Sequence, residues 1–145
     1  MTASAALDAL PALLKGLRNA LIADATLSPL LAGNKVMVRA GSSAPTPYIE
    51  LEPRQQDYST ADTDGQDFQI LAHVWHEPAS TAPETATCMA IMGHVRRILH
   101  TATLALDAPF NNVLTRVQSA VGPFHDPDAA VIHGTVIVRA VVDHA

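Results

Sequence analysis

The stretch that decides the fold is DFQILAHVWHE, residues 67–77. Its side chains alternate in character, as they do in a β-strand, where successive residues point to opposite faces. One face is wholly apolar and consists of Phe68, Ile70, Ala72 and Val74. The other face is partly apolar and consists of Leu71, His73 and Trp75. We therefore predict a strand that is covered on both sides or lies at a subunit interface.

Further strands are predicted on either side of this one. Val36 and Val38 share one side of a strand at residues 35–39, and residues 40–47 (AGSSAPTP) are typical of a turn. Another strand is expected at residues 48–51, closed by Pro53. Later in the chain the expected elements are a short strand at residues 104–106, an alternating strand at 113–121, a turn-rich loop at 122–128 and a long β-branched strand at 131–142. The alternating strand is expected to place Val113, Thr115, Val117, Ser119 and Val121 on one face.

Two helices are predicted from apolar residues that recur with the helical period of about 3.6 residues. The first begins at Asp8 as its N-cap, ends near Asp24, and has Pro11 in its first turn. A short helical turn follows at residues 28–31. The second helix is predicted to begin at a capping box formed by Thr81 and Glu84. The expected apolar stripes are Leu10, Leu14, Leu17 and Leu21 on the first helix, and Cys88, Met92, Val95 and Leu99 on the second.

The order of these elements predicts an α+β fold. Because strands and helices do not alternate strictly, a mainly antiparallel sheet packed with two main helices satisfies the pattern best. The 145 residues form one expected domain, residues 1–145, and 48% hydrophobic residues supply its core. No signal peptide or membrane-spanning run is evident, so we expect a soluble protein made in the cytoplasm. A single cysteine, Cys88, excludes an internal disulfide.

The net charge of −5 is concentrated in one segment. Residues 50–67 contain six acidic residues and one basic residue, Arg54, so they account for the whole excess. Within this segment, residues 54–66 are polar and lack an apolar period, which predicts a long exposed loop. Loops of this length are usually functional or disordered. A basic nucleic-acid-binding surface is not expected from this charge distribution.

The sequence contains no recognised catalytic or metal-binding motif. The patterns GxSxG, GxGxxG and the phosphate loop ending in GK[ST] are all absent. His73 and His76 are three residues apart on a strand, so they point to opposite faces and do not share an ion. A faint calcium-loop pattern around Gly65 lacks its first and last ligands. We therefore expect no enzyme activity, no metal and no cofactor, and we interpret Cys88 as an inert core thiol.

Five blocks of the sequence together resemble a known family. These blocks are residues 21–33, the strand PYIEL at 47–51, HVW at 73–75, the helix and its sequel at 95–107, and the segment from DPD at 126–128 to HG at 133–134. Their order and spacing are similar to those of the tail-completion, or tail-terminator, proteins of long-tailed phages and gene transfer agents.

The resemblance implies a structural protein of a virion or phage-like particle. In that family a small α+β subunit forms a ring, usually a hexamer, that caps the tail tube, stops its polymerisation and joins it to the head connector. The expected partners are further copies of the chain, the major tail tube protein on one side and a head-completion or stopper protein on the other. DNA passes through the lumen without specific binding, no membrane is involved, and assembly takes place in the host bacterial cytoplasm. The expected location is the neck, at the top of the tail.

Two other classes remain as alternatives. One is a different component of the neck, such as a stopper or an adaptor, and the other is a small-ligand-binding α+β domain. Within the favoured interpretation, the acidic segment either lines the lumen, where its charge lets DNA slide, or contacts a basic neighbouring ring. The expected contact residues are Arg54, Asp57, Asp62, Asp64 and Asp67. The expected subunit-interface or core residues are Phe68, Ile70, Trp75, Val136 and Val138.

Overall fold

The computed structural model describes residues 8–38, 44–58, 65–78, 85–126 and 130–144. These residues form an α+β fold, which confirms the predicted class. In chain order the elements are helix α1 (Leu10–Ala23), the 3-10 turn η2 (Ser28–Leu30), strands β1 (Val36–Met37), β2 (Tyr48–Tyr58) and β3 (Gln66–His76), helix α2 (Ala86–Leu99), and strands β4 (Phe110–Asp126) and β5 (Val131–His144).

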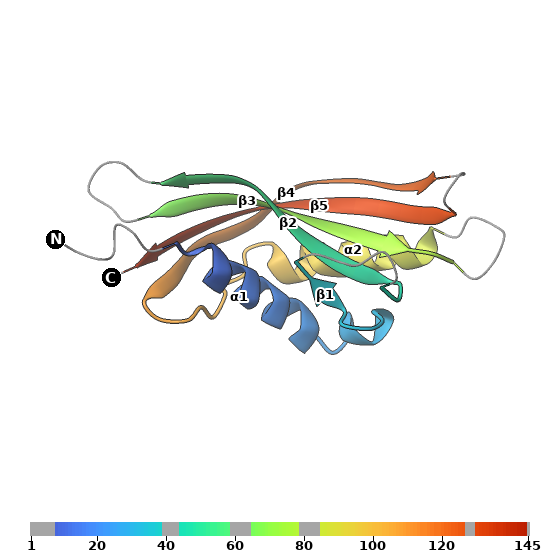
Figure 1. Cartoon of the computed structure of the whole chain (residues 1–145), viewed down its shortest axis with the longest axis horizontal. Helices are drawn as coiled ribbons and strands as arrows, with labels where there is room; N and C mark the ends of the chain where they lie inside the picture. Colours follow the sequence, from blue (N-terminus) through green and yellow to red (C-terminus); the bar gives the residue numbers. More distant parts are fainter. Residues whose placement is uncertain (1–7, 39–43, 59–64, 79–84, 127–129, 145) are drawn as a thin grey trace.

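The strands form one five-stranded sheet in the order β1-β2-β3-β5-β4. All neighbours are antiparallel except β1 and β2, which are parallel. Both helices lie against the same face of the sheet (Figure 1). The sheet therefore has one face covered by helices and one open face, and the predicted strand at residues 67–77 lies at its centre as β3.

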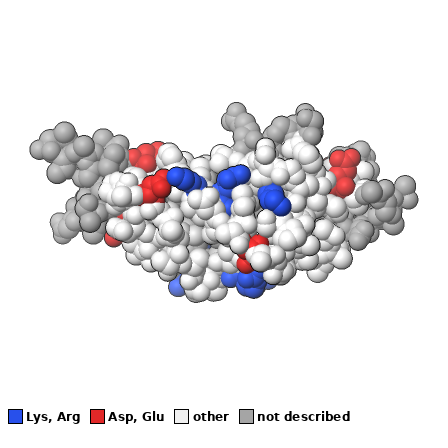
Figure 2. All heavy atoms as spheres, turned by 90° about the horizontal axis from the view of Figure 1, so that it is seen from below, with Lys and Arg blue, Asp and Glu red and all other residues white. Residues whose placement is uncertain are grey.

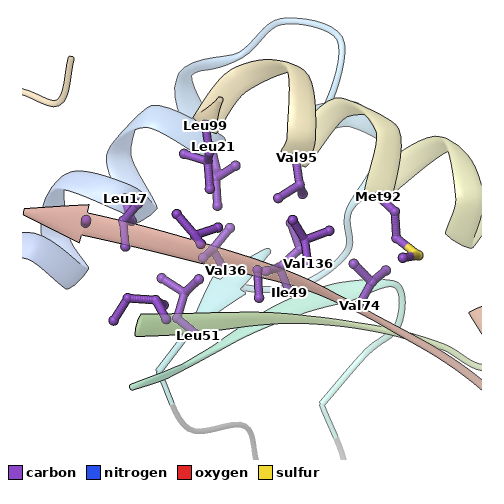
Figure 3. Close-up of a cluster of buried hydrophobic side chains, with 14 of the residues drawn as sticks. Leu17, Leu21, Val36, Ile49, Leu51, Val74, Met92, Val95, Leu99 and Val136 are labelled. Carbon is purple, nitrogen blue, oxygen red and sulfur yellow. The ribbon is translucent and has the colours of Figure 1, made fainter. Parts of the chain in front are cut away.

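The core lies between the covered face and the two helices. The predicted apolar side of β3 is buried, and residues of β5 lie beside it on the same face of the sheet. Helix α2 contributes the predicted stripe together with Ile91, and helix α1 contributes Leu13, Leu17 and Leu21. Leu17, Leu21, Val95 and Leu99 point toward Val36, Ile49 and Val136 in this layer (Figure 3). Burial of this kind stabilises a fold by about 25 cal/mol for each Å² of apolar surface removed from water.

The two helix starts differ from the sequence-based expectation. The N-cap of α1 is Ala9 rather than Asp8, although Asp8 Oδ1 accepts a hydrogen bond from the Leu10 amide at 2.9 Å. The buried side of α1 includes Leu13, whereas Leu10 and Leu14 are only half-buried. Helix α2 is described from Ala86, with Thr85 as its N-cap. The predicted capping box of Thr81 and Glu84 lies outside the described residues.

Two prolines do not end their strands, which corrects two expectations. Strand β2 continues through Pro53 to Tyr58, and β4 continues through Pro123 to Asp126. Strand β1 pairs only with Ile49 and Glu50, and β4 is an edge strand. A proline lacks the N–H that a central strand needs, but it is tolerated where a side of the strand has no partner. Register shifts at both positions accommodate the irregular backbone.

The predicted strand at residues 104–106 is wrong, because these residues have no regular secondary structure. The Leu104 amide donates to Asn112 Oδ1 at 2.9 Å instead of to a neighbouring strand. Leu104 is 6% exposed, and a Cβ added at Gly16 of α1 would lie 2.6 Å from Leu106 Cδ2. The segment thus packs against α1, so its leucines are apolar for packing and not for strand pairing.

The predicted alternation at residues 113–121 is also only partly correct. Thr115 is 1% exposed, whereas Val113 and Val121 are 59% and 45% exposed. Register shifts between Asn112 and Leu114, and between Val117 and Ser119, change which residues face the helices. Bulges of this kind also make an edge strand a poor template for pairing with another chain.

Candidate functional site

A cluster of polar side chains occupies the open face of the sheet near one end. His73 on β3 is its centre: Nε2 lies 2.7 Å from Glu52 Oε1, and Nδ1 lies 2.9 Å from His133 Nε2. Thr135 Oγ1 lies 3.1 Å from the same Nδ1 atom. We call Glu52, His73, His133 and Thr135 the histidine cluster. It joins three neighbouring strands, and it was not predicted, because His73 and His133 are 60 residues apart.

Trp75 extends this cluster toward the end of the sheet. Its ring stacks on the His133 ring with 3.9 Å between centroids and 6° between planes, and its Nε1 donates to Glu50 Oε1 at 3.4 Å. Trp75 is half-buried on the open face, so it is not part of the core. Burial, followed by repulsion from His73, lowers the pKa of His133. The hydrogen bond from His73 lowers the pKa of Glu52.

The described side chains do not form a metal site. No group of three His, Cys, Asp or Glu residues in the described parts of the chain is placed to hold an ion. Cys88 is fully buried, and this burial raises the pKa of its thiol to about 11. A thiol with such a pKa is not a nucleophile at neutral pH, because the thiolate is the reactive form.

Residues 54–58 and Gln66 lie in paired strands, which corrects this part of the loop predicted at residues 54–66; residues 59–64 lie outside the described residues. Residues 54–58 belong to β2, and Gln66 is buried in β3. Asp57 and Asp67 are partners in the β2–β3 register. Asp62 and Asp64 lie outside the described residues. We call residues 54–58 with Gln66 and Asp67 the acidic hairpin.

Two bases neutralise part of this charge. Arg139 of β5 holds Asp67 through three N–H···O contacts of 2.8, 3.1 and 3.2 Å. Arg54 lies 3.8 Å from Glu52. The sequence suggested that the acids lie together in an isolated loop, but tertiary contacts pair Asp67 with a distant arginine.

The residues expected at an interface or in the core separate into two groups. Phe68, Ile70, Val136 and Val138 are at most 1% exposed and belong to the core of the chain. Trp75 lies on the opposite face of β3. Of this set, therefore, only Trp75 has surface that another molecule can contact without unfolding the chain.

A pocket of about 580 Å³ opens beside Trp75. It lies where β2 and β5 begin and where β3 and β4 end. We call it the terminal pocket, and the residues that give it its character are Tyr48, Trp75, Glu77, Phe124, Asp126 and His133. Phe124 is 62% exposed, the largest exposed fraction among the described large apolar residues. The terminal pocket and the acidic hairpin lie at opposite ends of the sheet (Figure 1).

A second cleft, of about 610 Å³, lies between α2 and β4. We call it the basic cleft, and its lining includes Gly93, Arg96, Arg97, His100 and residues 117–120. Arg97 donates to Asp24 Oδ1 at 2.9 Å, and this bond lowers the pKa of Asp24 to about 2. Figure 2 shows lysine and arginine side chains over the middle of the face seen from below, with acidic side chains mostly toward its ends.

The fold and its surfaces are those of a small α+β subunit with an open, polar sheet face. The family model described as Tail completion protein gp17 matches residues 15–143. The chain therefore belongs to the tail completion protein gp17 family, whose members are structural proteins of virion tails.

A solved structure shares this fold. It is a chain of the "Virion of native gene transfer agent (GTA) particle", with a TM-score of 0.72 and 24% sequence identity. The match covers 92% of this chain and 96% of that chain. A comparison with curated protein sequences finds no match. In the described residues, no helix is both long and apolar enough to cross a membrane.

Proposed function

We propose that this protein is a tail terminator that forms a hexameric ring on the end of the tail tube. The ring ends polymerisation of the tube and joins the tail to the head connector, and its channel lets DNA pass without specific binding. Membership of the tail completion family over residues 15–143 carries this proposal. The likeness to a chain of a gene transfer agent virion, over 92% of this protein, supports a place in such a particle.

Tube termination requires a subunit with two different axial surfaces. One surface binds the last ring of the major tail tube protein, and the other binds a head-completion or stopper protein. The acidic hairpin lies at one end of the sheet and is the candidate for one of these surfaces.

The acidic segment at residues 50–67, which includes the acidic hairpin, is proposed to act at one axial surface or in the lumen. Its candidate residues are Arg54, Asp57, Asp62, Asp64 and Asp67. In a lumen, repeated carboxylates would repel phosphates and let DNA slide. Against a neighbouring ring, they would bind basic residues by electrostatic complementarity.

Charge reversal distinguishes these two roles. Asp62→Lys and Asp64→Lys should leave tails unattached to heads if the contact is axial, and should slow DNA release from complete particles if it is lumenal. Asp67→Lys also breaks the Arg139 ion pair, so Asp67→Asn serves as its control. Normal particle yield with normal DNA release in the reversal variants would remove the acidic segment from the proposal.

Removal of the protein tests the function as a whole. Particles assembled without it should carry tail tubes of uncontrolled length that are not joined to heads, as seen by negative-stain imaging. Purified protein added to these tubes should form a ring at one end. Tails of normal length joined to heads would contradict the proposal. Binding to a portal-side ring, with no binding to tubes, would identify a stopper or adaptor.

A further inference from the structure

The terminal pocket has the chemistry of a site for a cationic side chain. The stacked rings of Trp75 and His133 form one wall, and Tyr48 and Phe124 add aromatic surface. The carboxylates of Glu77 and Asp126 also line it. A guanidinium binds over an aromatic face by cation–π attraction and pairs with a carboxylate through two parallel hydrogen bonds.

The charges in the pocket favour a cation over an anion. Burial lowers the pKa of His133 below its ordinary value, which disfavours a positive charge on this ring. Glu77 is exposed, and its carboxylate makes no hydrogen bond or ion pair with another described residue. A carboxylate that lies beside exposed aromatic rings and pairs with no cation among the described residues is the arrangement that a partner's arginine completes.

A closed ring of identical subunits indicates where that cation comes from. Each contact in such a ring joins two different surfaces of the same chain, so a pocket at this contact receives a side chain from elsewhere on the chain. Six of the eight described lysines and arginines already contact an acidic side chain or a backbone carbonyl. Within the described residues, the side chains of Arg96 and Arg116 contact neither an acidic side chain nor a backbone carbonyl.

Arg96 has the more suitable surroundings of the two. It is exposed and lines the basic cleft, a concave surface that shares no residue with the terminal pocket. Arg116 is paired in register with Arg139 on β4 and β5 and does not line that cleft. We propose that Arg96 of one copy enters the terminal pocket of the next copy, where it pairs with Glu77 beside Trp75 and Phe124. This inference rests on the proposed ring.

Charge exchange tests the contact directly. Arg96→Glu and Glu77→Arg should each weaken self-association about tenfold or more, because each places like charges together at the interface. The double variant, Arg96→Glu with Glu77→Arg, should restore association. Arg116→Glu makes the same change in charge outside the basic cleft and should leave association unchanged. Sedimentation of the purified protein, and imaging of rings on tail tubes, measure each variant against the wild type.

Crosslinking gives a second readout that does not depend on charge. A mixture of the Glu77→Cys and Arg96→Cys variants should form a covalent dimer with a short bis-maleimide crosslinker, because the linker spans the gap left by the two shortened side chains, which a direct disulfide does not reach. Neither variant alone should do so. The native Cys88 is fully buried and does not compete. Circular dichroism of each variant confirms that it is folded.

The outcomes separate this inference from the proposed function. Wild-type rings without a crosslink, together with reversal variants that assemble normally, would overturn the Arg96 contact and leave the ring intact. Reversal variants that fail to assemble, but without rescue in the double variant or a crosslink, would also overturn it. A wild-type protein that forms no ring, either alone or on tubes, would overturn both.

Discussion

The Nδ1 atom of His73 lies 2.9 Å from the Nε2 atom of His133 across the β3–β5 ladder. At this distance one ring donates and the other accepts, so the pair accommodates one proton between these atoms. Glu52 holds the far nitrogen of His73 at 2.7 Å, while the His133 ring stacks on Trp75. A second proton between these atoms would set two N–H groups against each other and break this cross-strand bond.

Stability should therefore decrease as the solution becomes acidic. Because burial lowers the pKa of His133 below its usual 6.5, the unfolded state binds more protons than the folded state once the pH falls through that value. The free energy of unfolding should be constant between about pH 7 and pH 8 and should fall between pH 7 and pH 5. Urea denaturation at these pH values measures it. The hydrogen bond from His73 lowers the pKa of Glu52 below 4.5, so Glu52 also stabilises the folded state. This part of the free energy of unfolding is lost only when the pH falls below the range in which His133 acts.

The variant His133→Phe isolates the cause of this pH dependence. It keeps an aromatic ring beside Trp75 but does not titrate, so its free energy of unfolding should change less between pH 7 and pH 5. His125→Gln is the control, because His125 is exposed at the end of β4. Equal slopes in the wild type and in His133→Phe would show that the His73–His133 pair does not set the pH dependence.

The ion pair between Asp67 and Arg139 should contribute a measurable but small stabilisation. Its side chains are 39% and 42% exposed, and its geometry is bidentate. A double-mutant cycle with Asp67→Asn and Arg139→Gln should give a coupling energy of about 0.5 kcal/mol. The same cycle at Lys15 and Asp107, which are 61% and 62% exposed, should give a coupling near zero. A larger coupling at the second pair would contradict this assignment.

Local sequence pattern predicted the centre of this fold well, and tertiary context explains the errors. The alternation in β3 is strong because Phe68 and its neighbours face a core layer, so burial and sequence agree. At Pro53 the sequence predicted a stop, since a proline breaks a strand that has partners on both sides. The missing partner of β2 at this point is a property of the assembled sheet and leaves no mark on nearby residues.

The candidate site was predictable only in part for the same reason. The family resemblance identified a tail completion protein. Trp75 was predicted as a subunit-interface or core residue, and it lies half-buried on the open face of the sheet. The partners that give Trp75 its environment, His133 and Phe124, are distant in sequence and meet it only when β3, β5 and β4 form the sheet. In the sequence the nearest histidine to His73 is His76, but the histidine that His73 contacts is His133 of β5.

Two helical glycines should respond in opposite ways to alanine. A Cβ on Gly93 would meet nothing within 4 Å, so Gly93→Ala should raise the free energy of unfolding by about 0.5–1 kcal/mol through helix propensity. A Cβ on Gly16 would lie 2.6 Å from Leu106 Cδ2 and 3.3 Å from the Ala105 carbonyl oxygen. Gly16→Ala should therefore lower stability, because the segment that crosses α1 must move. Thermal or urea unfolding compares the stability of the two variants. Equal stabilisation by Gly93→Ala and Gly16→Ala would show that residues 104–106 move away from α1 at no cost in free energy.

Two phenylalanines separate folding from assembly. Phe68 is 1% exposed in the core, so Phe68→Ala should lower the free energy of unfolding by about 3–5 kcal/mol. Phe124 is 62% exposed at the rim of the terminal pocket, so Phe124→Ala should change the free energy of unfolding by about 0.5 kcal/mol or less. If the pocket receives Arg96 of a neighbouring copy, Phe124→Ala should nevertheless weaken ring formation, because it removes aromatic surface from the contact. Urea denaturation measures the first effect, and sedimentation together with ring imaging measures the second. A Phe124→Ala protein that is fully stable and assembles as well as the wild type would show that this rim makes no contact in the ring.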